Sequence, residues 1–155
     1  MAETSLTIRE DDPAAPYVAD LLALHLTELR SVMADFAFAL DSTGLSAADV
    51  TFWTAWQGAE LAGFAALKQL EPGHGEVKSM RAAPLVRRSG VGRALLNHII
   101  GVAKARGYAR LSLETGTATL HAPAIALYQS LGFVPCAAFA DYQPSPHNQF
   151  FALEL

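Results

Sequence analysis

The sequence has a single cysteine and no long hydrophobic run. Among its 155 residues only Cys136 carries a thiol, which excludes an internal disulfide framework and a zinc site built from cysteines. No apolar run approaches the roughly 18 residues that cross a membrane, and no basic segment followed by an apolar run marks a secretion signal. We therefore expect a soluble, cytoplasmic protein that does not associate with membranes.

Charge of one sign is missing from two long segments. Residues 77–110 carry eight Lys and Arg and no Asp or Glu, whereas residues 111–155 carry three acidic residues and no basic one. Residues 1–76 carry twelve acidic and three basic residues, so the formal net charge of −4 conceals one wholly basic stretch. Such a stretch indicates a negatively charged partner, either a phosphate-bearing ligand or a nucleic acid.

Hydrophobic patterns predict one domain, residues 1–155, built from strands and helices. At 52% hydrophobic residues the chain can bury a substantial core. We expect strands at 6–9, 51–56, 61–70, 76–82, 111–115, 133–139 and 149–155, and helices from residue 17 and at 92–104 and 123–131. Residues 35–49 are expected to form a loop and a short helix capped by Ser46. This order of elements indicates an α+β fold, an α/β sandwich with a mixed sheet.

A loop with two glycines, placed between a predicted strand and a predicted helix, is the most informative segment. Its consecutive residues are Arg87, Arg88, Ser89, Gly90, Val91, Gly92 and Arg93. The glycines let successive backbone N–H groups point at one anion at the positive end of the helix dipole, and arginines add charge-assisted hydrogen bonds. The loop is neither a Walker A loop nor a G-x-G-x-x-G fingerprint. We predict that it binds a pyrophosphate.

The loop resembles the R-x-x-G-x-G/A segment of the GNAT superfamily of N-acetyltransferases. The segments around it agree: residues 78–82 precede it, residues 94–96 follow it, and residues 124–133 are similar to the final helix of the family. Residues 75–80, 113–116 and 139–142 also resemble a bacterial subset whose substrate is unassigned. The resemblance implies a GNAT-like fold with a mixed, mostly antiparallel sheet flanked by helices. It also implies transfer of an acetyl group from acetyl-CoA to a primary amine of a small molecule or protein, by direct attack and without a metal.

The same resemblance implicates a set of cofactor-binding residues. In the family the strand before the loop contacts the pantetheine arm and offers a backbone N–H to the thioester carbonyl, which here points to Met80, Arg81 and Ala82. Loop residues 87–93 would hold the pyrophosphate. Where many members have an asparagine seven residues before a helix tyrosine, this chain has His121, which can hydrogen-bond the pantetheine or cap the helix.

Three residues are candidates for proton transfer. Tyr128 occupies the family position beside the coenzyme sulfur, and a phenol with a pKa near 10 stays protonated at neutral pH, so it is the predicted general acid; packing on the sheet is the alternative. The base is Glu76 or Glu114, and the sequence does not choose between them. Alternation places Glu76 on the same face as Lys78 and Met80, and either glutamate can instead be a salt-bridge partner of a neighbouring base.

The acceptor pocket is expected near the first helix and the loop before the last strand, where an aromatic and acidic set suits a cationic amine. Its candidate residues are His25, Glu28, Trp53, Asp141, Tyr142, His147 and Asn148. A catalytically idle acyl-CoA-binding sensor of the same fold is the alternative function. Nucleic-acid binding is disfavoured, because Tyr108 is the one aromatic residue in the basic stretch. A homodimer is the commonest assembly on general grounds.

Overall fold

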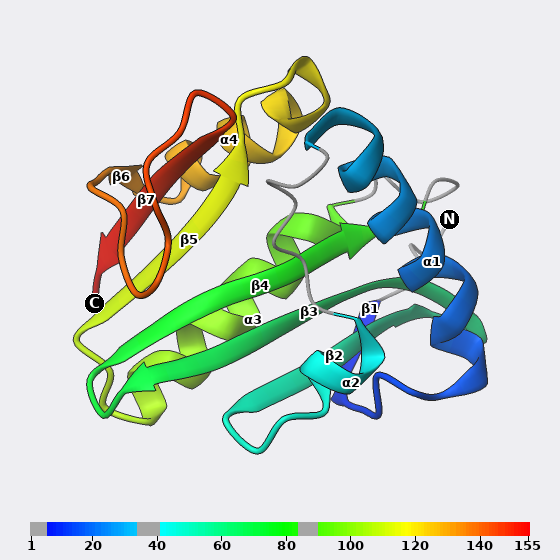
Figure 1. Cartoon of the computed structure of the whole chain (residues 1–155). Helices are drawn as coiled ribbons and strands as arrows, with labels where there is room; N and C mark the ends of the chain where they lie inside the picture. The colour runs from blue at the N-terminus through cyan, green and yellow to red at the C-terminus, as the bar shows by residue number, and fades with distance from the viewer. Residues whose placement is uncertain (1–5, 34–40, 84–89) are drawn as a thin grey trace.

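The computed structural model describes residues 6–33, 41–83 and 90–155, which build one seven-stranded sheet with helices on both faces (Figure 1). The strands are β1 (Leu6–Glu10), β2 (Val50–Gln57), β3 (Glu60–Glu71), β4 (His74–Ala82), β5 (Arg110–Gly116), β6 (Val134–Pro135) and β7 (Asn148–Glu154). The helices are α1 (Pro16–Met33), α2 (Ser42–Leu45), α3 (Val91–Ala105), the 3₁₀ turn η3 (Thr119–His121) and α4 (Ala122–Ser130). This order confirms the predicted α+β fold. No helix in the described ranges has both the length and the apolar character needed to cross a membrane.

The sheet is antiparallel at every join except one. Its strand order is β1-β2-β3-β4-β5-β7-β6, and β4 and β5 are the parallel pair. The chain between these two strands forms α3 and crosses one face of the sheet, as a parallel connection requires. Strands β1 to β4 are antiparallel neighbours in chain order. The one parallel join therefore lies inside the sheet and separates a four-stranded half from a three-stranded half.

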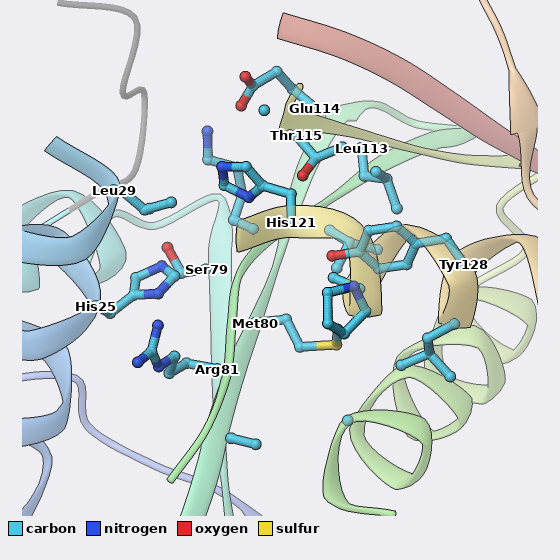
Figure 2. Close-up of a pocket in the computed structure, with 18 of the residues that line it drawn as sticks. His25, Leu29, Ser79, Met80, Arg81, Leu113, Glu114, Thr115, His121 and Tyr128 are labelled. Atoms are coloured by element: carbon cyan, nitrogen blue, oxygen red, sulfur yellow. The ribbon is translucent and has the colours of Figure 1, made fainter. Parts of the chain in front are cut away.

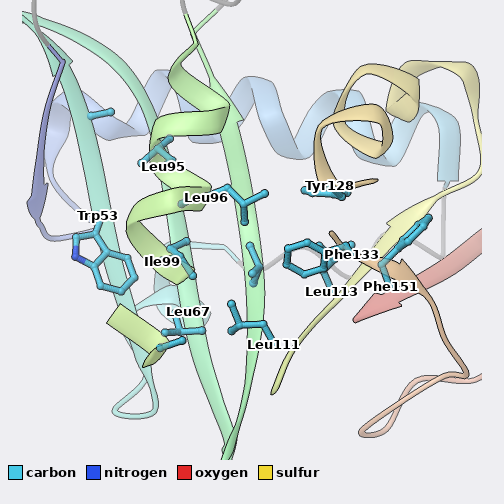
Figure 3. Packing of buried hydrophobic residues seen from close by; sticks show 14 of the residues in the cluster. Trp53, Leu67, Leu95, Leu96, Ile99, Leu111, Leu113, Tyr128, Phe133 and Phe151 are labelled. Atoms are coloured by element: carbon cyan, nitrogen blue, oxygen red, sulfur yellow. The ribbon is translucent and has the colours of Figure 1, made fainter. Parts of the chain in front are cut away.

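The larger part of the core lies between the sheet and α3 (Figure 3). Leu95, Leu96 and Ile99 of α3 are fully buried, which confirms the face expected from their spacing. They belong to the same cluster as Leu67 of β3 and Leu111 of β5. This face holds α3 against the strands on both sides of the parallel join.

A smaller cluster on the opposite face attaches α1. Val18 and Leu22 of α1 are buried with Phe52 of β2 and Phe64 of β3, whose ring centroids lie 5.5 Å apart. Figure 1 shows α1 in front of the sheet and α3 behind it. The two faces of β4 therefore meet different surroundings, and this difference positions the functional side chains described below.

The closing strand expected at residues 133–139 is much shorter in the structure. β6 ends at Pro135, and after a last hydrogen bond from Cys136 N–H to Phe150 O at 2.9 Å the chain leaves the sheet. The aromatic ring of Phe139 then packs edge-on against Phe150, at 5.8 Å between centroids. Hydrophobic residues that looked like part of a strand are thus the anchor of a loop.

The predicted cap of the short helix is also wrong. Ser46 follows the end of α2 as its C-cap residue, and the N-cap is Asp41, whose carboxylate accepts a hydrogen bond from Gly44 N–H at 2.9 Å. Both residue types favour N-caps, so the pattern alone did not distinguish them.

Candidate functional site

The parallel strands β4 and β5 separate partway along their length, and a cavity opens between them. Their paired residues end at Glu76 opposite Ser112. Beyond this pair, residues 77–82 and 113–116 line a cavity of about 400 Å³, together with residues of α1, α3 and α4 (Figure 2). Beyond this pair the backbone N–H and C=O groups of β4 and β5 no longer form hydrogen bonds with each other. An extended ligand that contains amide groups can therefore form hydrogen bonds with these two strand edges.

A bulge in β4 determines which side chains face each side of the sheet. Arg81 pairs with Phe64, but Lys78 pairs with Ala66, so β4 has one residue more than β3 over this stretch. Ser79 lies in the bulge with φ of 54°, a conformation that costs a non-glycine residue about 1 kcal/mol or more. A bulge leaves backbone groups outside the ladder at the place where the sequence predicts a donor for the thioester carbonyl.

The bulge also corrects the predicted alternation. Met80 packs against the cluster on the α3 side, together with Ala82, whereas Arg81 forms an ion pair with Glu28 of α1. Lys78 pairs with Glu76 on the α1 side. The expectation that Met80 shares a face with Glu76 and Lys78 is therefore wrong, because the extra residue reverses the alternation after Lys78.

The glycine-containing turn leads directly into α3. Gly90 is the N-cap residue with φ of 81°, and Gly92 follows so close to α4 that a Cβ there would lie 3.2 Å from Leu127 Cδ2. Val91 is fully buried in the core, so its side chain faces away from the cavity and its backbone alone is available to a ligand. Arg93 lines the cavity and donates to Ser130 Oγ at 3.0 Å. The preceding loop residues of the prediction, Arg87, Arg88 and Ser89, lie outside the described residues.

Tyr128 of α4 points its hydroxyl into the cavity (Figure 2). Its ring lies 6.0 Å from that of Phe133 and is 8% exposed. Burial, with a smaller effect of the Glu114 charge, raises the pKa of Tyr128 to about 12. The phenol therefore stays protonated at neutral pH and can donate a proton.

Glu114 of β5 lies at the edge of the same cavity. Asn148 Nδ2 of β7 donates a hydrogen bond to its carboxylate Oε2. Burial raises the pKa of Glu114, while the hydrogen bond from Asn148 and the charge of Lys78 oppose the rise. A carboxylate with a raised pKa is a stronger base than an exposed glutamate.

Glu76, the other candidate base, is occupied by a network that joins β4 to the loop before β7. Tyr142 donates a hydrogen bond to Glu76 Oε2 at 2.5 Å, and Lys78 Nζ lies 3.4 Å from the same oxygen. Lys78 also donates to the Tyr142 hydroxyl at 2.7 Å. Burial and the neighbouring Glu76 raise the pKa of Tyr142. The arrangement gives Glu76 two partners in the absence of any substrate.

A second polar group forms the α1 wall of the cavity. Arg81 Nη1 forms an ion pair with Glu28 Oε2 at 2.7 Å, and Figure 2 shows the His25 ring between Ser79 and Arg81. His25 also packs edge-on against Phe64 at 5.6 Å. Burial and the charge of Arg81 lower the pKa of His25 to about 4, so its imidazole is neutral at neutral pH.

The remaining predicted residues divide between the cavity and other places. His121 lines the cavity and is the N-cap residue of α4, but its side chain makes no capping hydrogen bond. Trp53 packs edge-on against His98 in the core on the α3 side, and Asp141 and His147 are exposed outside the cavity. Of the residues predicted for the acceptor pocket, His25 and Tyr142 line the cavity, and Glu28 and Asn148 contact the lining residues Arg81 and Glu114. Sequence reasoning missed Ser79, since no sequence signal marks the bulge.

The comparisons with known proteins agree with this geometry. The model of the family described as "Acetyltransferase (GNAT) family" matches residues 15–133. The chain is 45% identical to the uncharacterized N-acetyltransferase YedL of Escherichia coli over 96% of this chain and 94% of the other. It is 34% identical to an IAA acetyltransferase of Azospirillum brasilense, with coverage of 97% and 99%.

A solved structure extends the likeness to three dimensions. The ribosomal-protein-S18-alanine N-acetyltransferase of Escherichia coli is 26% identical, with a TM-score of 0.68 and coverage of 97% of this chain and 94% of the other. The family match spans more than half of the sequence, and YedL matches nearly all of it. The chain therefore belongs to the acetyltransferase (GNAT) family and is an acyltransferase.

Proposed function

We propose that the protein transfers an acetyl group from acetyl-CoA to a primary amine by direct attack in a ternary complex. One observation carries the proposal: the cavity where β4 and β5 separate is lined at once by the N-terminus of α3, the bulged strand β4, Tyr128 and Glu114. The N-terminus of α3 can bind an anion, and the bulged strand β4 offers backbone N–H donors to a carbonyl oxygen. Tyr128 can donate a proton, and Glu114 can accept one.

Acetyl-CoA fits the α3 side of the cavity. A Cβ placed on Gly90 would meet no atom of the described residues within 4 Å, and the N-terminus of this 15-residue helix can face a phosphate group there. Arg93 lines the same region, and we propose that Arg87, Arg88 and Ser89 complete the pyrophosphate site. Met80, Ala82 and the backbone of Arg81 would contact the pantetheine arm, with the buried His121 Nε2 as a further polar contact.

The residues of the chain account for the proton balance. When bound, acetyl-CoA supplies the acetyl thioester. The amine nitrogen forms a bond to the thioester carbonyl carbon, and the bond from that carbon to sulfur breaks. Glu114 accepts one proton from the amine, directly or through a water molecule, and Tyr128 donates a proton to the departing sulfur. We assign the role of base to Glu114 rather than Glu76, because the Glu76 carboxylate already accepts a hydrogen bond from Tyr142 and forms an ion pair with Lys78.

The basic stretch supports a phosphate ligand over a nucleic acid. Lys78 and Arg81 are largely buried and form ion pairs with glutamates, and Arg110 faces Glu154. Arg93 is committed to Ser130 at the end of α4. These described bases do not form a continuous positive surface, which nucleic-acid binding would require.

Relatives leave the type of amine open. The Azospirillum brasilense protein is named for IAA and the Escherichia coli protein for the alanine of a ribosomal protein. Amines of small molecules and of proteins are therefore both acceptors to test. The cytoplasmic location and the homodimer expected from the sequence stay predictions.

Two glycines provide a matched test of the acetyl-CoA site. Gly90 and Gly107 both have φ of 81°, and a Cβ at either would meet no atom within 4 Å in the parts of the chain that the structure describes. Valine at either position should therefore cost similar stability, about 1–2 kcal/mol. Calorimetry with acetyl-CoA should show at least tenfold weaker binding for Gly90→Val and little change for Gly107→Val. Absence of acetyl-CoA binding by the wild type, or equal affinity of both variants, would contradict the proposed site.

A further inference from the structure

Several buried polar atoms around the cavity have no hydrogen-bond partner among the residues that the structure describes. On the α1 side they are both ring nitrogens of His25, Ser79 Oγ, and Nε and Nη2 of Arg81. His121 Nε2, at the start of α4, is the atom assigned above to acetyl-CoA. All four residues line the one cavity. Buried polar groups in folded proteins are nearly always bonded, and a group of exceptions in one cavity indicates that a ligand completes them.

The two free nitrogens of Arg81 lie on one edge of the guanidinium. Nη1 forms the ion pair with Glu28, whereas Nε and Nη2, whose N–H bonds run parallel, have no hydrogen-bond partner among the described residues. Two parallel N–H donors match the two oxygens of a carboxylate. The Arg81 side chain is 11% exposed and is fixed by Glu28, so this edge is held in place before a ligand arrives.

The position of this edge separates it from the acetyl-CoA site. Met80 faces the α3 side of the sheet, but Arg81 faces α1, because the bulge at Ser79 lies just before them. The phosphates of acetyl-CoA are assigned to the N-terminus of α3. An anion on the α1 side therefore belongs to the second substrate.

The charges on this wall favour a carboxylate over a phosphate. Glu28 already neutralises Arg81, and His25 is neutral at neutral pH because its pKa is lowered to about 4. Lys78, another described base that lines the cavity, is paired with Glu76. The wall thus offers several N–H and O–H donors with little excess positive charge, which suits a singly charged anion.

We propose that the acceptor is a small amine of the amino-acid class, whose carboxylate is bound by the Nε and Nη2 edge of Arg81 beside His25 and Ser79. Its amino group extends across the cavity toward Glu114; Figure 2 shows Glu114 and Arg81 at opposite ends of the labelled residues. The inference rests on the proposed acetyl transfer and specifies its substrate.

The test compares matched amines in a thiol-release assay at saturating acetyl-CoA. Each pair is an amino acid and its amide, such as glycine and glycinamide, β-alanine and its amide, and phenylalanine and its amide. We expect kcat/KM to be at least tenfold higher for the acid of the preferred pair. The amide is the less basic amine and has more of its neutral form, so intrinsic reactivity works against this result. Equal or better turnover of the amides would overturn the inference and leave acetyl transfer intact.

Variants then assign the preference to Arg81. Because Arg81→Gln alone removes the positive charge that faces the half-buried Glu28 carboxylate, the double variant Arg81→Gln, Glu28→Gln is made alongside it. In a folded variant the ratio of kcat/KM for acid over amide should fall toward one. Arg110→Gln is the control, since Arg110 also pairs with a glutamate and has a buried Nε without a hydrogen bond, but lies outside the cavity. A ratio unchanged in the double variant would contradict the assignment.

A binding experiment covers the case in which no amine in the panel releases thiol. N-acetylglycine, N-acetylphenylalanine and their amides are titrated into the CoA-bound protein while the NMR signals of the His25 ring are followed. Shifts with the acids but not with the amides would support the carboxylate site even though acetyl transfer had failed. No shift with either acid, or equal shifts with the amides, would overturn it.

Discussion

Replacing Tyr128 by phenylalanine should slow acetyl transfer with little effect on folding. The substitution removes the hydroxyl that faces the cavity and keeps the ring that packs at 6.0 Å from Phe133. Loss of a positioned general acid typically lowers the rate 10²- to 10⁴-fold, so we expect kcat to fall about 100-fold, or about 2.7 kcal/mol in the barrier. KM for acetyl-CoA should change less than threefold, a rough bound for a contact that acts mainly in the transition state.

The assay is steady-state thiol release, combined with a single-turnover measurement that shows chemistry to be rate-limiting. Tyr108→Phe is the matched control, because Tyr108 is also buried in the α3-side core but donates its hydroxyl to Gln69 at 3.1 Å, outside the cavity. Since the pKa of Tyr128 is raised to about 12, the wild type should show no loss of kcat from Tyr128 ionisation up to about pH 10. An unchanged kcat in Tyr128→Phe under chemistry-limited conditions would remove this residue from the mechanism.

Three further predictions concern titrating groups. Glu114→Gln should lower kcat about 100-fold and abolish the acid limb of the pH–rate profile, which in the wild type should lie above the usual glutamate range because burial raises the pKa of Glu114. For Asp11, burial opposes ionisation, but hydrogen bonds from Thr54 and Tyr17 lower the pKa to about 2. Its stabilisation, about 1 kcal/mol, is present above about pH 4 and is lost as pH falls toward 2, so urea unfolding of wild type and Asp11→Asn should converge there. His25 has a folded-state pKa of about 4, below its unfolded value near 6.5. The wild type should therefore lose about 2 kcal/mol of stability between pH 7 and pH 5, and His25→Phe should not; equal losses would refute the buried neutral ring.

Local patterns were enough to predict much of the fold and half of the site. The spacing of Leu95, Leu96 and Ile99 determines which face of α3 is buried, and this depends on neighbours along the helix. Gly90 at the start of α3 was likewise recognisable from its own segment. These features are encoded within a few residues of each other.

The rest of the site depends on register and on contacts between distant segments. One extra residue in β4 moves Met80 to the opposite face from the predicted one, and nothing in the residues around Ser79 distinguishes a bulge from a regular strand. The pairing of Arg81 with Glu28 joins residues more than fifty positions apart. Glu76 and Glu114 looked equivalent in the sequence, and the ring of Tyr142, brought from the loop before β7, makes them different.

The short ladder between β4 and β5 is also a weak connection between the two halves of the sheet. The hydrogen-bond ladder between β4 and β5 ends at Glu76. Where the two strands have separated, Tyr142 of the C-terminal half forms hydrogen bonds with Glu76 and Lys78 of β4. The pairs β1–β2, β2–β3 and β5–β7 are held by longer ladders. Any widening of the cavity between the two halves would therefore stretch the hydrogen bonds that Tyr142 makes with Glu76 and Lys78.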